Sequence, residues 1–170
     1  MAGEIGHVIV QPGGPRCACG LSGCLEALAA GPAILREARA RRGTAPTDRG
    51  PSLLDAPGPL TTARVYQAAG AGDALARVVT QQAGEYLVQA VLSLVMTCDV
   101  ERVVFGGGVA RAGAAFLDPI SADLDELRQA SPVAAEVLPP GLIGRVPEGY
   151  EAGLWGALAL ADAAPGAGTS

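Results

Sequence analysis

The sequence contains no lysine and no asparagine, and it has a single histidine. All twelve basic residues are arginine. The absence of lysine excludes the phosphate-binding lysine of a Walker-type loop, a Schiff-base lysine and a serine–lysine nucleophile pair. The one histidine, His7, lies just before a group of cysteines, which leaves little room for a Ser-His-Asp triad. Several common enzyme chemistries are therefore excluded before any motif is considered.

The chain also lacks a basic surface. Its net charge is −5, and its densest group of arginines, in residues 36–42, is typical of the solvated end of a helix, where cations suit the helix dipole. An acidic chain without a basic face binds nucleic acid poorly. We therefore expect no nucleic-acid partner for this chain.

A long apolar run is missing as well. The most apolar stretch, residues 86–98, is interrupted by Gln89 and Ser93 and falls short of the ~20 residues that span a bilayer. The N-terminus has neither the charged start nor the apolar segment of a secretory signal. We expect a cytoplasmic protein without a membrane partner. In that compartment reduced thiols are more often metal ligands than disulfides.

The composition is that of one globular domain. The chain has 170 residues, 49% of them hydrophobic, and a chain of this length buries roughly 70% of its unfolded surface. We assign residues 1–163 to this domain and residues 164–170 to a flexible tail. Glycine, at 24 residues, is about twice its average usage, so we expect many tight turns or close backbone approaches.

The first part of the chain is predicted to be mainly helical. Asp73 is a plausible N-cap for a long helix, and Thr61 or Thr62 for a shorter one. The expected elements are a short strand end over residues 7–10, a helix beginning at Cys24 and interrupted at Gly31-Pro32, a second helix from Pro32 to about Arg42, a loop or flap over residues 43–60, a short helix through Tyr66 and Gln67, and a long helix to about Cys98.

The second part adds the clearest strand. The continuous apolar run over residues 102–105 predicts a strand buried on both faces, and it leads directly into a glycine triplet. Further expected elements are a helix between Ala110 and Gln129, a weaker strand over 135–138, and a last helix from about Gly153 to Ala163. Strands alternating with helices indicate an α/β fold. Cys98 is predicted to be a small buried hydrophobe near a helix end.

The histidine and three of the four cysteines lie within one short segment. His7, Cys17, Cys19 and Cys24 offer one imidazole and three thiols, a full tetrahedral set for zinc. A Gly-x-x-Gly turn before Cys24 can reverse the chain, and four protein ligands would close the coordination sphere. We therefore predict a structural Zn²⁺ ion that does not activate water. The alternative is a set of unpaired cysteines in a glycine-rich loop.

This segment carries a family resemblance. Glu4-Ile5-Gly6-His7, followed by Cys-x-Cys-Gly-x-x-Gly-Cys-x-Glu, closely resembles the signature of the ROK family (repressors, open reading frames and sugar kinases). Further matches are Gly70-Ala71-Gly72-Asp73, the run from Val103 to Val109, and Gly-x-x-Gly-Ala from Gly153. The resemblance covers nearly the whole chain but only about the C-terminal half of a family member. It implies a partial actin-like (ribonuclease H-like) ATPase domain, the C-terminal lobe with a structural zinc loop.

The resemblance also implies a hexose, or a hexose derivative, as the bound partner. Glu4 and His7 would hydrogen-bond sugar hydroxyls, and Glu26 would contact the sugar near its anomeric end. Ionised carboxylates make short, strong hydrogen bonds to hydroxyls, and His7 could use one ring nitrogen for zinc and the other for the sugar. The alternatives are an ordinary surface carboxylate for Glu4 and a dipole-favoured glutamate at a helix start for Glu26.

A nucleotide site is suggested by Gly106, Gly107 and Gly108. Glycines after a buried strand offer unhindered backbone amides to a phosphate or to adenosine, although such turns also occur where only tight turning is needed. The triplet resembles the nucleotide-side loop of actin-like kinases, which implies ATP and Mg²⁺ in a complete family member.

Other elements of such a kinase are absent from these residues. No Asp-x-Gly-x-Thr phosphate turn occurs, and the general-base aspartate of the family's N-terminal domain cannot be placed. We therefore expect that this chain alone is not a competent kinase, and that missing early strands leave an exposed sheet edge.

Three functions remain open: part of a glucokinase-like ATP-dependent hexose kinase, the effector domain of a ROK-type transcriptional repressor, or an inactive zinc-stabilised fragment. The family resemblance also implies a homo-oligomer. The sequence favours the kinase because nothing helix-turn-helix-like is present.

Overall fold

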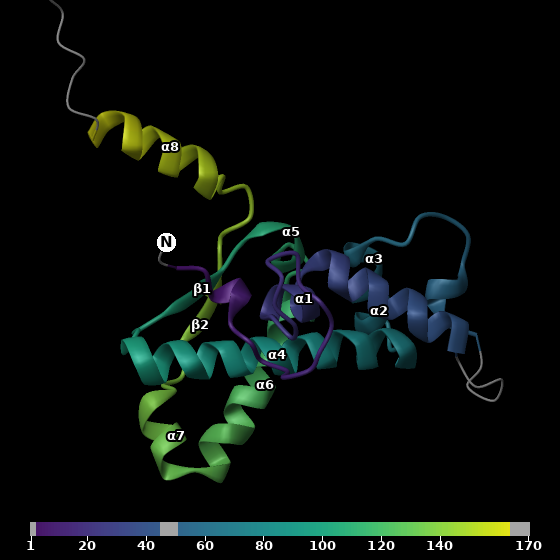
Figure 1. Cartoon of the computed structure of the whole chain (residues 1–170), viewed down its shortest axis with the longest axis horizontal. Coiled ribbons are helices and arrows are strands. Elements are labelled where there is room, and N and C mark those ends of the chain that lie inside the picture. Colours follow the sequence, from purple (N-terminus) through teal and green to yellow (C-terminus); the bar gives the residue numbers. More distant parts are fainter. Residues whose placement is uncertain (1–2, 45–50, 164–170) are drawn as a thin grey trace, which may run out of the picture.

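A computed structural model describes residues 3–44 and 51–163 of the chain. Figure 1 shows a mainly helical body with a small two-stranded sheet beside it. The predicted flexible tail, residues 164–170, and part of the predicted flap lie outside the described residues. The elements are η1 (Ile5–His7), α1 (Leu25–Ala29), α2 (Gly31–Thr44), η3 (Leu53–Asp55), α3 (Thr62–Gly70), α4 (Ala74–Cys98), β1 (Val103–Phe105), α5 (Gly107–Ala110), α6 (Ala114–Ala130), α7 (Pro132–Val137), β2 (Ile143–Arg145) and α8 (Ala152–Ala163).

The longest helix, α4, is the spine of the molecule (Figure 1). Asp73 caps its first turn by accepting a hydrogen bond from the Ala76 N–H, and the same carboxylate accepts one from Leu53 N–H at 2.6 Å. Thr61 caps α3 in the same way. These caps satisfy N–H groups that a helix start leaves unpaired, which is why the helices begin where the sequence predicts.

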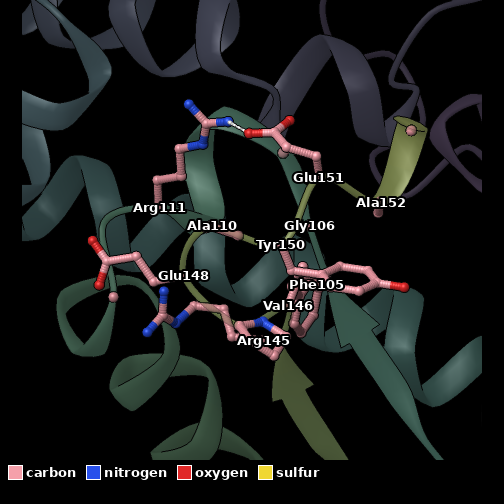
Figure 2. A pocket seen from close by; sticks show the side chains of 15 residues that line it. Phe105, Gly106, Ala110, Arg111, Arg145, Val146, Glu148, Tyr150, Glu151 and Ala152 are labelled. Carbon is pink, nitrogen blue, oxygen red and sulfur yellow. Dashed lines mark ion pairs between the residues drawn. The ribbon is translucent and has the colours of Figure 1, made fainter. Parts of the chain in front are cut away.

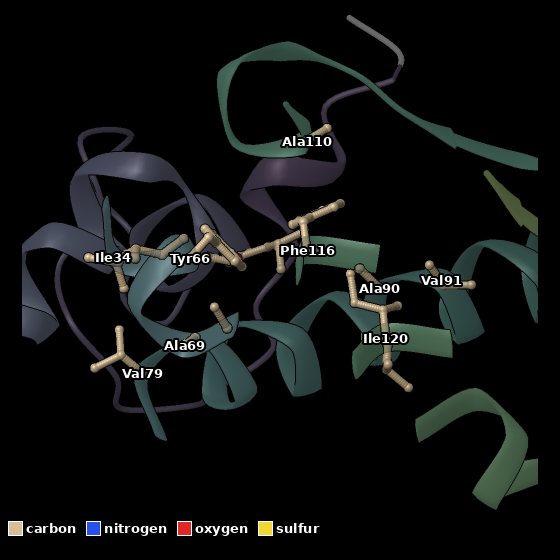
Figure 3. Close-up of a cluster of buried hydrophobic side chains, with 14 of the residues drawn as sticks. Ile34, Tyr66, Ala69, Val79, Ala90, Val91, Ala110, Phe116 and Ile120 are labelled. Atoms are coloured by element: carbon tan, nitrogen blue, oxygen red, sulfur yellow. The ribbon is translucent and has the colours of Figure 1, made fainter. Parts of the chain in front are cut away.

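The hydrophobic core lies where α3, α4 and α6 pack together. Phe116 and Ile120 of α6 are buried against α3 and α4 (Figure 3). The Phe116 ring packs edge-on against Tyr66 of α3, with ring centroids 5.8 Å apart, and against Phe105 of β1, with centroids 5.3 Å apart. Phe116 therefore connects the helical core to the sheet. The α1 and α2 helices also pack against α4.

Strands β1 and β2 pair in parallel, with Val103 opposite Ile143 and Phe105 opposite Arg145. Parallel strands usually have both faces covered. Here Val104 is 53% exposed, so the prediction of burial on both faces is wrong for this strand. In the described residues this sheet contains only these two strands.

Three further predictions are wrong. Residues 135–138 fall in helix α7 and the turn after it, because Ser131 caps that helix and Pro132 occupies its first position, signals that outweigh the β-branched valines. Residues 7–10 form no strand: η1 ends at His7, and Ile9 makes only an isolated bridge to Cys24. Cys98 is exposed because it is the last residue of α4, at a helix end where residues 96–99 are all exposed.

The last helix, α8, extends away from the body (Figure 1). Its large apolar side chains are exposed, namely Leu154, Trp155, Leu158 and Leu160. In the described part of the chain, every helix is too short or too polar to cross a lipid bilayer. The predicted α/β class is confirmed, with helices dominating the described residues.

Candidate functional site

The segment from Val10 to Gly23 folds into a loop closed by backbone hydrogen bonds. The N–H groups of Val10 and Gln11 both donate to the Gly23 carbonyl, at 3.0 and 3.2 Å. At the tip, Cys17 N–H donates to the Leu21 carbonyl at 2.8 Å. Gly23 has φ +80°, and a Cβ there would lie 1.7 Å from the Gln11 carbonyl oxygen, so only glycine allows this closure. We call residues 7–24 the metal loop.

The metal loop brings all four predicted ligands together. One ligand atom from each of His7, Cys17, Cys19 and Cys24 lies within 4.8 Å of the others. His7 Nδ1 lies 3.7 Å from Cys17 Sγ, and Cys19 Sγ lies 3.6 Å from Cys24 Sγ. Ligand atoms around tetrahedral zinc are about 3.3–3.8 Å apart, as bonds of about 2.0–2.3 Å require. The residues therefore fit a tetrahedral ion, and the two sulfur atoms are too far apart for a disulfide.

The thiols of the metal loop differ in their surroundings. Burial, together with the neighbouring thiols of Cys19 and Cys17, raises the pKa of the Cys24 thiol to about 12. The backbone N–H of Leu21 helps to lower the pKa of the exposed Cys19 thiol. A bound cation would favour the thiolate forms of cysteine ligands and offset the repulsion between them.

Glu26 lies beside the metal loop. Its carboxylate Oε2 is 3.6 Å from His7 Nδ1, slightly longer than a hydrogen bond. The contact arises because Leu25 N–H donates to the Val8 carbonyl at the start of α1, and because Gly6 packs against the Glu26 side chain, where a Cβ would lie 3.6 Å from that of Glu26. The side chains of Glu4 and Glu26 are both exposed, and His7 is half-buried.

A separate hollow of about 530 Å³ opens where β1 and β2 end (Figure 2). Gly106 and Gly107 line it, whereas Gly108 does not. Gly107 has φ +82°, a conformation that favours glycine, and a Cβ on Gly106 would lie 3.2 Å from Val146. The structure therefore places two of the three predicted glycines at the hollow, and none of the metal-loop residues lines it.

Sequence reasoning missed the charged and aromatic side chains of this hollow. Figure 2 shows Arg111 and Glu151 meeting at 3.9 Å on one side, with Arg145 on the opposite side. Tyr150 also lines it and stacks on Trp155, with ring centroids 6.3 Å apart. Arg145 is the last residue of β2, and Tyr150 and Glu151 follow it, whereas Arg111 follows β1 and α5. Because the carboxyl ends of parallel strands meet at one edge, recognition of residues 143–145 as a strand would have revealed the β2 side of the hollow.

Residues 1–164 match the ROK family. The chain belongs to this family. The ROK assignment made from the motif at residues 4–26 is therefore confirmed, because the match extends over nearly the whole domain.

Similar proteins are named as sugar kinases and as a regulator. A glucokinase of Halalkalibacterium halodurans is 42% identical over 125 residues, 71% of this chain and 37% of that protein. A solved ROK family glucokinase from Streptomyces griseus, in complex with glucose and AMPPNP, is 29% identical with a TM-score of 0.76, covering 94% of this chain and 51% of that one. A solved ROK family transcriptional regulator, a homologue of the E. coli MLC protein, is 31% identical with a TM-score of 0.68, over 85% of this chain and 34% of the other.

These comparisons have one feature in common. The chain spans between about a third and a half of the length of the ROK proteins it matches. The predicted actin-like ATPase fold agrees with the fold of the solved ROK sugar kinases.

Proposed function

We propose that this chain is the sugar-binding, zinc-containing part of an ATP-dependent, glucokinase-like ROK hexose kinase. The observation that carries the proposal is the position of His7, whose Nδ1 lies 3.7 Å from Cys17 Sγ and 3.6 Å from a carboxylate oxygen of Glu26. Both distances are to Nδ1, so one edge of the imidazole faces the candidate metal ligands and also the carboxylate of Glu26 near the start of helix α1.

The metal part of the proposal assigns His7, Cys17, Cys19 and Cys24 as ligands of a structural Zn²⁺ ion. Four protein ligands leave no open position, so the ion would crosslink the metal loop and would supply no activated water. Binding the metal through Nδ1 leaves Nε2 to carry the ring proton, so His7 can donate a hydrogen bond to a sugar hydroxyl.

The sugar part assigns Glu4, His7 and Glu26 as contacts to a hexose or hexose derivative. An ionised carboxylate accepts hydrogen bonds from two vicinal hydroxyls, and such charge-assisted bonds are strong. The hydrogen bond from Leu25 N–H to the Val8 carbonyl holds Glu26 next to His7, and its exposure leaves the carboxylate available to a ligand. The relative solved with glucose supports the hexose class.

The nucleotide part assigns Gly106, Gly107 and Gly108 to the ATP side in a complete family member. The hollow at the strand ends supports this for Gly106 and Gly107, whose backbones border about 530 Å³ of space. Arg145 offers a positive charge there for phosphate, and Mg²⁺ would come with the nucleotide. Because these residues contain no Asp-x-Gly-x-Thr turn and no assigned general base, the proposal includes that the chain alone does not transfer phosphate.

An effector domain of a ROK-type transcriptional repressor is the second candidate function. The similar solved regulator favours it, since the metal loop and a sugar contact would serve an effector as well as a substrate. The metal-loop geometry does not distinguish the two. The protein sequence encoded upstream does: an Asp-x-Gly-x-Thr motif supports the kinase, and a winged helix-turn-helix supports the repressor. We propose the cytoplasm as the location and a homo-oligomer as the assembly, as for either function.

Calorimetric titration of the zinc-loaded chain with glucose, mannose and N-acetylmannosamine tests the sugar assignment. We expect one of these sugars to bind, and Glu26→Gln to weaken that binding at least tenfold, because a hydrogen bond to a charged group contributes about 1.5–3 kcal/mol. Glu136→Gln on the exposed face of α7 is the matched control and should bind as the parent does. One equivalent of zinc with no binding of any of the three sugars contradicts the sugar assignment and leaves the inactive zinc-stabilised fragment.

A further inference from the structure

A line of hydrogen bonds connects helix α2 to the metal loop through one face of α4. Arg41 donates to Gln82 Oε1 at 3.0 Å, Gln82 Nε2 donates to the Tyr86 hydroxyl at 3.3 Å, and that hydroxyl donates to Gln11 Oε1 at 2.9 Å. Arg41 is itself held by Glu37, one turn earlier on α2, at 2.6 Å. Gln11, Gln82, Tyr86 and Glu37 border a groove of about 270 Å³ between the metal loop, α1, α2 and α4.

Gln11 is the point where this line reaches the metal loop. Its N–H donates to the Gly23 carbonyl, and its own carbonyl accepts the Gly14 N–H at 2.9 Å. The Gln11 carbonyl also fills the space where a side chain of Gly23 would lie. A shift of Gln11 therefore moves Gly23, and Cys24 is the next residue along the chain.

Tyr86 suits this position because its hydroxyl both donates and accepts. The hydroxyl accepts a hydrogen bond from Gln82 and donates one to Gln11. The half-buried ring on α4 holds the hydroxyl in place between them. Phenylalanine would keep the ring and remove both hydrogen bonds. In this line of hydrogen bonds, the partners of Tyr86 are Gln82 and Gln11 and not the four candidate metal ligands. Tyr86 therefore acts on the ligands through Gln11.

We propose that Tyr86 is a positioning residue for the metal loop: by holding Gln11, it keeps the closure at Gly23 and therefore Cys24 in the arrangement that accepts the ion. This inference rests on the proposed function, since it takes the four residues to be zinc ligands. The loop must keep this arrangement before the metal arrives, and a preorganised site loses less conformational freedom on binding.

The experiment measures zinc affinity by competition with a chelator and zinc release after chelator addition. The proteins are the parent chain, Tyr86→Phe, Gln11→Ala and the double variant. We expect each single variant to weaken zinc binding about threefold to tenfold, the range for loss of one hydrogen bond between neutral groups. The double variant should be no weaker than Gln11→Ala, because both changes remove the same contact. Co²⁺ absorption reports whether the tetrahedral ligand set persists.

Tyr66→Phe is the matched control, since it removes a hydroxyl from α3 inside the core, and Tyr66 is not part of the line of hydrogen bonds from Arg41 to Gln11. It should release zinc at the parent rate. Unchanged zinc affinity in Tyr86→Phe, or losses that add in the double variant, would overturn the inference while leaving the metal assignment intact. Equal losses in Tyr66→Phe and Tyr86→Phe would also overturn it, since they indicate a general loss of stability. A parent chain that binds no zinc overturns the metal assignment itself, and this inference with it.

Discussion

The metal loop and the strand-end hollow are two candidate sites built in different ways. The metal loop takes all its ligands from residues 7–24, and backbone hydrogen bonds close it on itself. The hollow is assembled from two segments, residues 105–113 and 145–153, that meet only because β1 and β2 pair. One site is a product of local sequence, and the other is a product of tertiary structure.

The two sites also use glycine differently. At Gly23 a side chain is excluded by the Gln11 carbonyl, whereas at Gly107 the surroundings are open and only the positive φ requires glycine. Both Gly23 and Gly107 have a positive φ, and Gly23 is restricted by packing as well. We therefore expect the structure of the metal loop to depend on its candidate ligands, and the shape of the strand-end hollow to depend on the packing of the core that holds β1 and β2.

The largest expected effect comes from removing a ligand of the metal loop. Cys24→Ser should lower zinc affinity by at least two orders of magnitude and lower the melting temperature, because the free energy of structural zinc binding, about 10–16 kcal/mol in small domains, couples to folding. Cys98→Ser is the control, since Cys98 lies exposed at the end of α4. The zinc-to-protein ratio after dialysis and the melting temperature give the result. Equal zinc content in the two variants would contradict the assignment of Cys24.

The next effect tests the body beneath the hollow. Phe116→Ala should lower the free energy of unfolding by about 3–5 kcal/mol, because it empties a buried site that Phe105 and Tyr66 share. Trp155→Ala should change it by no more than about 0.5 kcal/mol, because that indole is 56% exposed on α8. Urea unfolding followed by circular dichroism measures both. A large loss in Trp155→Ala would mean that α8 packs against the body in solution.

The smallest effect separates two neighbouring glycines. Gly107→Ala should cost about 1–2 kcal/mol of stability, the penalty of a left-handed backbone for a residue with a Cβ. Gly108→Ala meets open space at an ordinary φ and should be neutral or slightly stabilising. Thermal unfolding of the two variants provides the comparison. If both lose the same amount, the positive φ at Gly107 is not what restricts the turn.

The sequence predicted the features that depend on nearby residues and missed those that depend on tertiary contacts. The caps Thr61 and Asp73 act within a few residues, so the helices they start were predicted correctly. Strand β2 was missed because a three-residue strand with a glycine in its centre has no local signal, and only its pairing with β1 makes it a strand.

The sites divide in the same way. The four candidate metal ligands could be predicted as a group because their spacing in the sequence is short, and the structure brings them together. The contact between Gln11 and Tyr86 spans 75 positions, and no pattern in either segment indicates it. The charged side chains of the hollow were missed for the same reason as β2, since their neighbours come from distant segments.

The separation of Cys98 from the other three cysteines has a practical consequence. An alkylating reagent that modifies free thiols should react once per molecule when the other three are held as ligands, and up to four times after chelation. The chain has no lysine, so amine-directed reagents have no side chain in it to attack. A fluorophore attached at Cys98 would report on the C-terminal end of α4, the end opposite to Asp73. It would leave the cysteines of the metal loop unmodified.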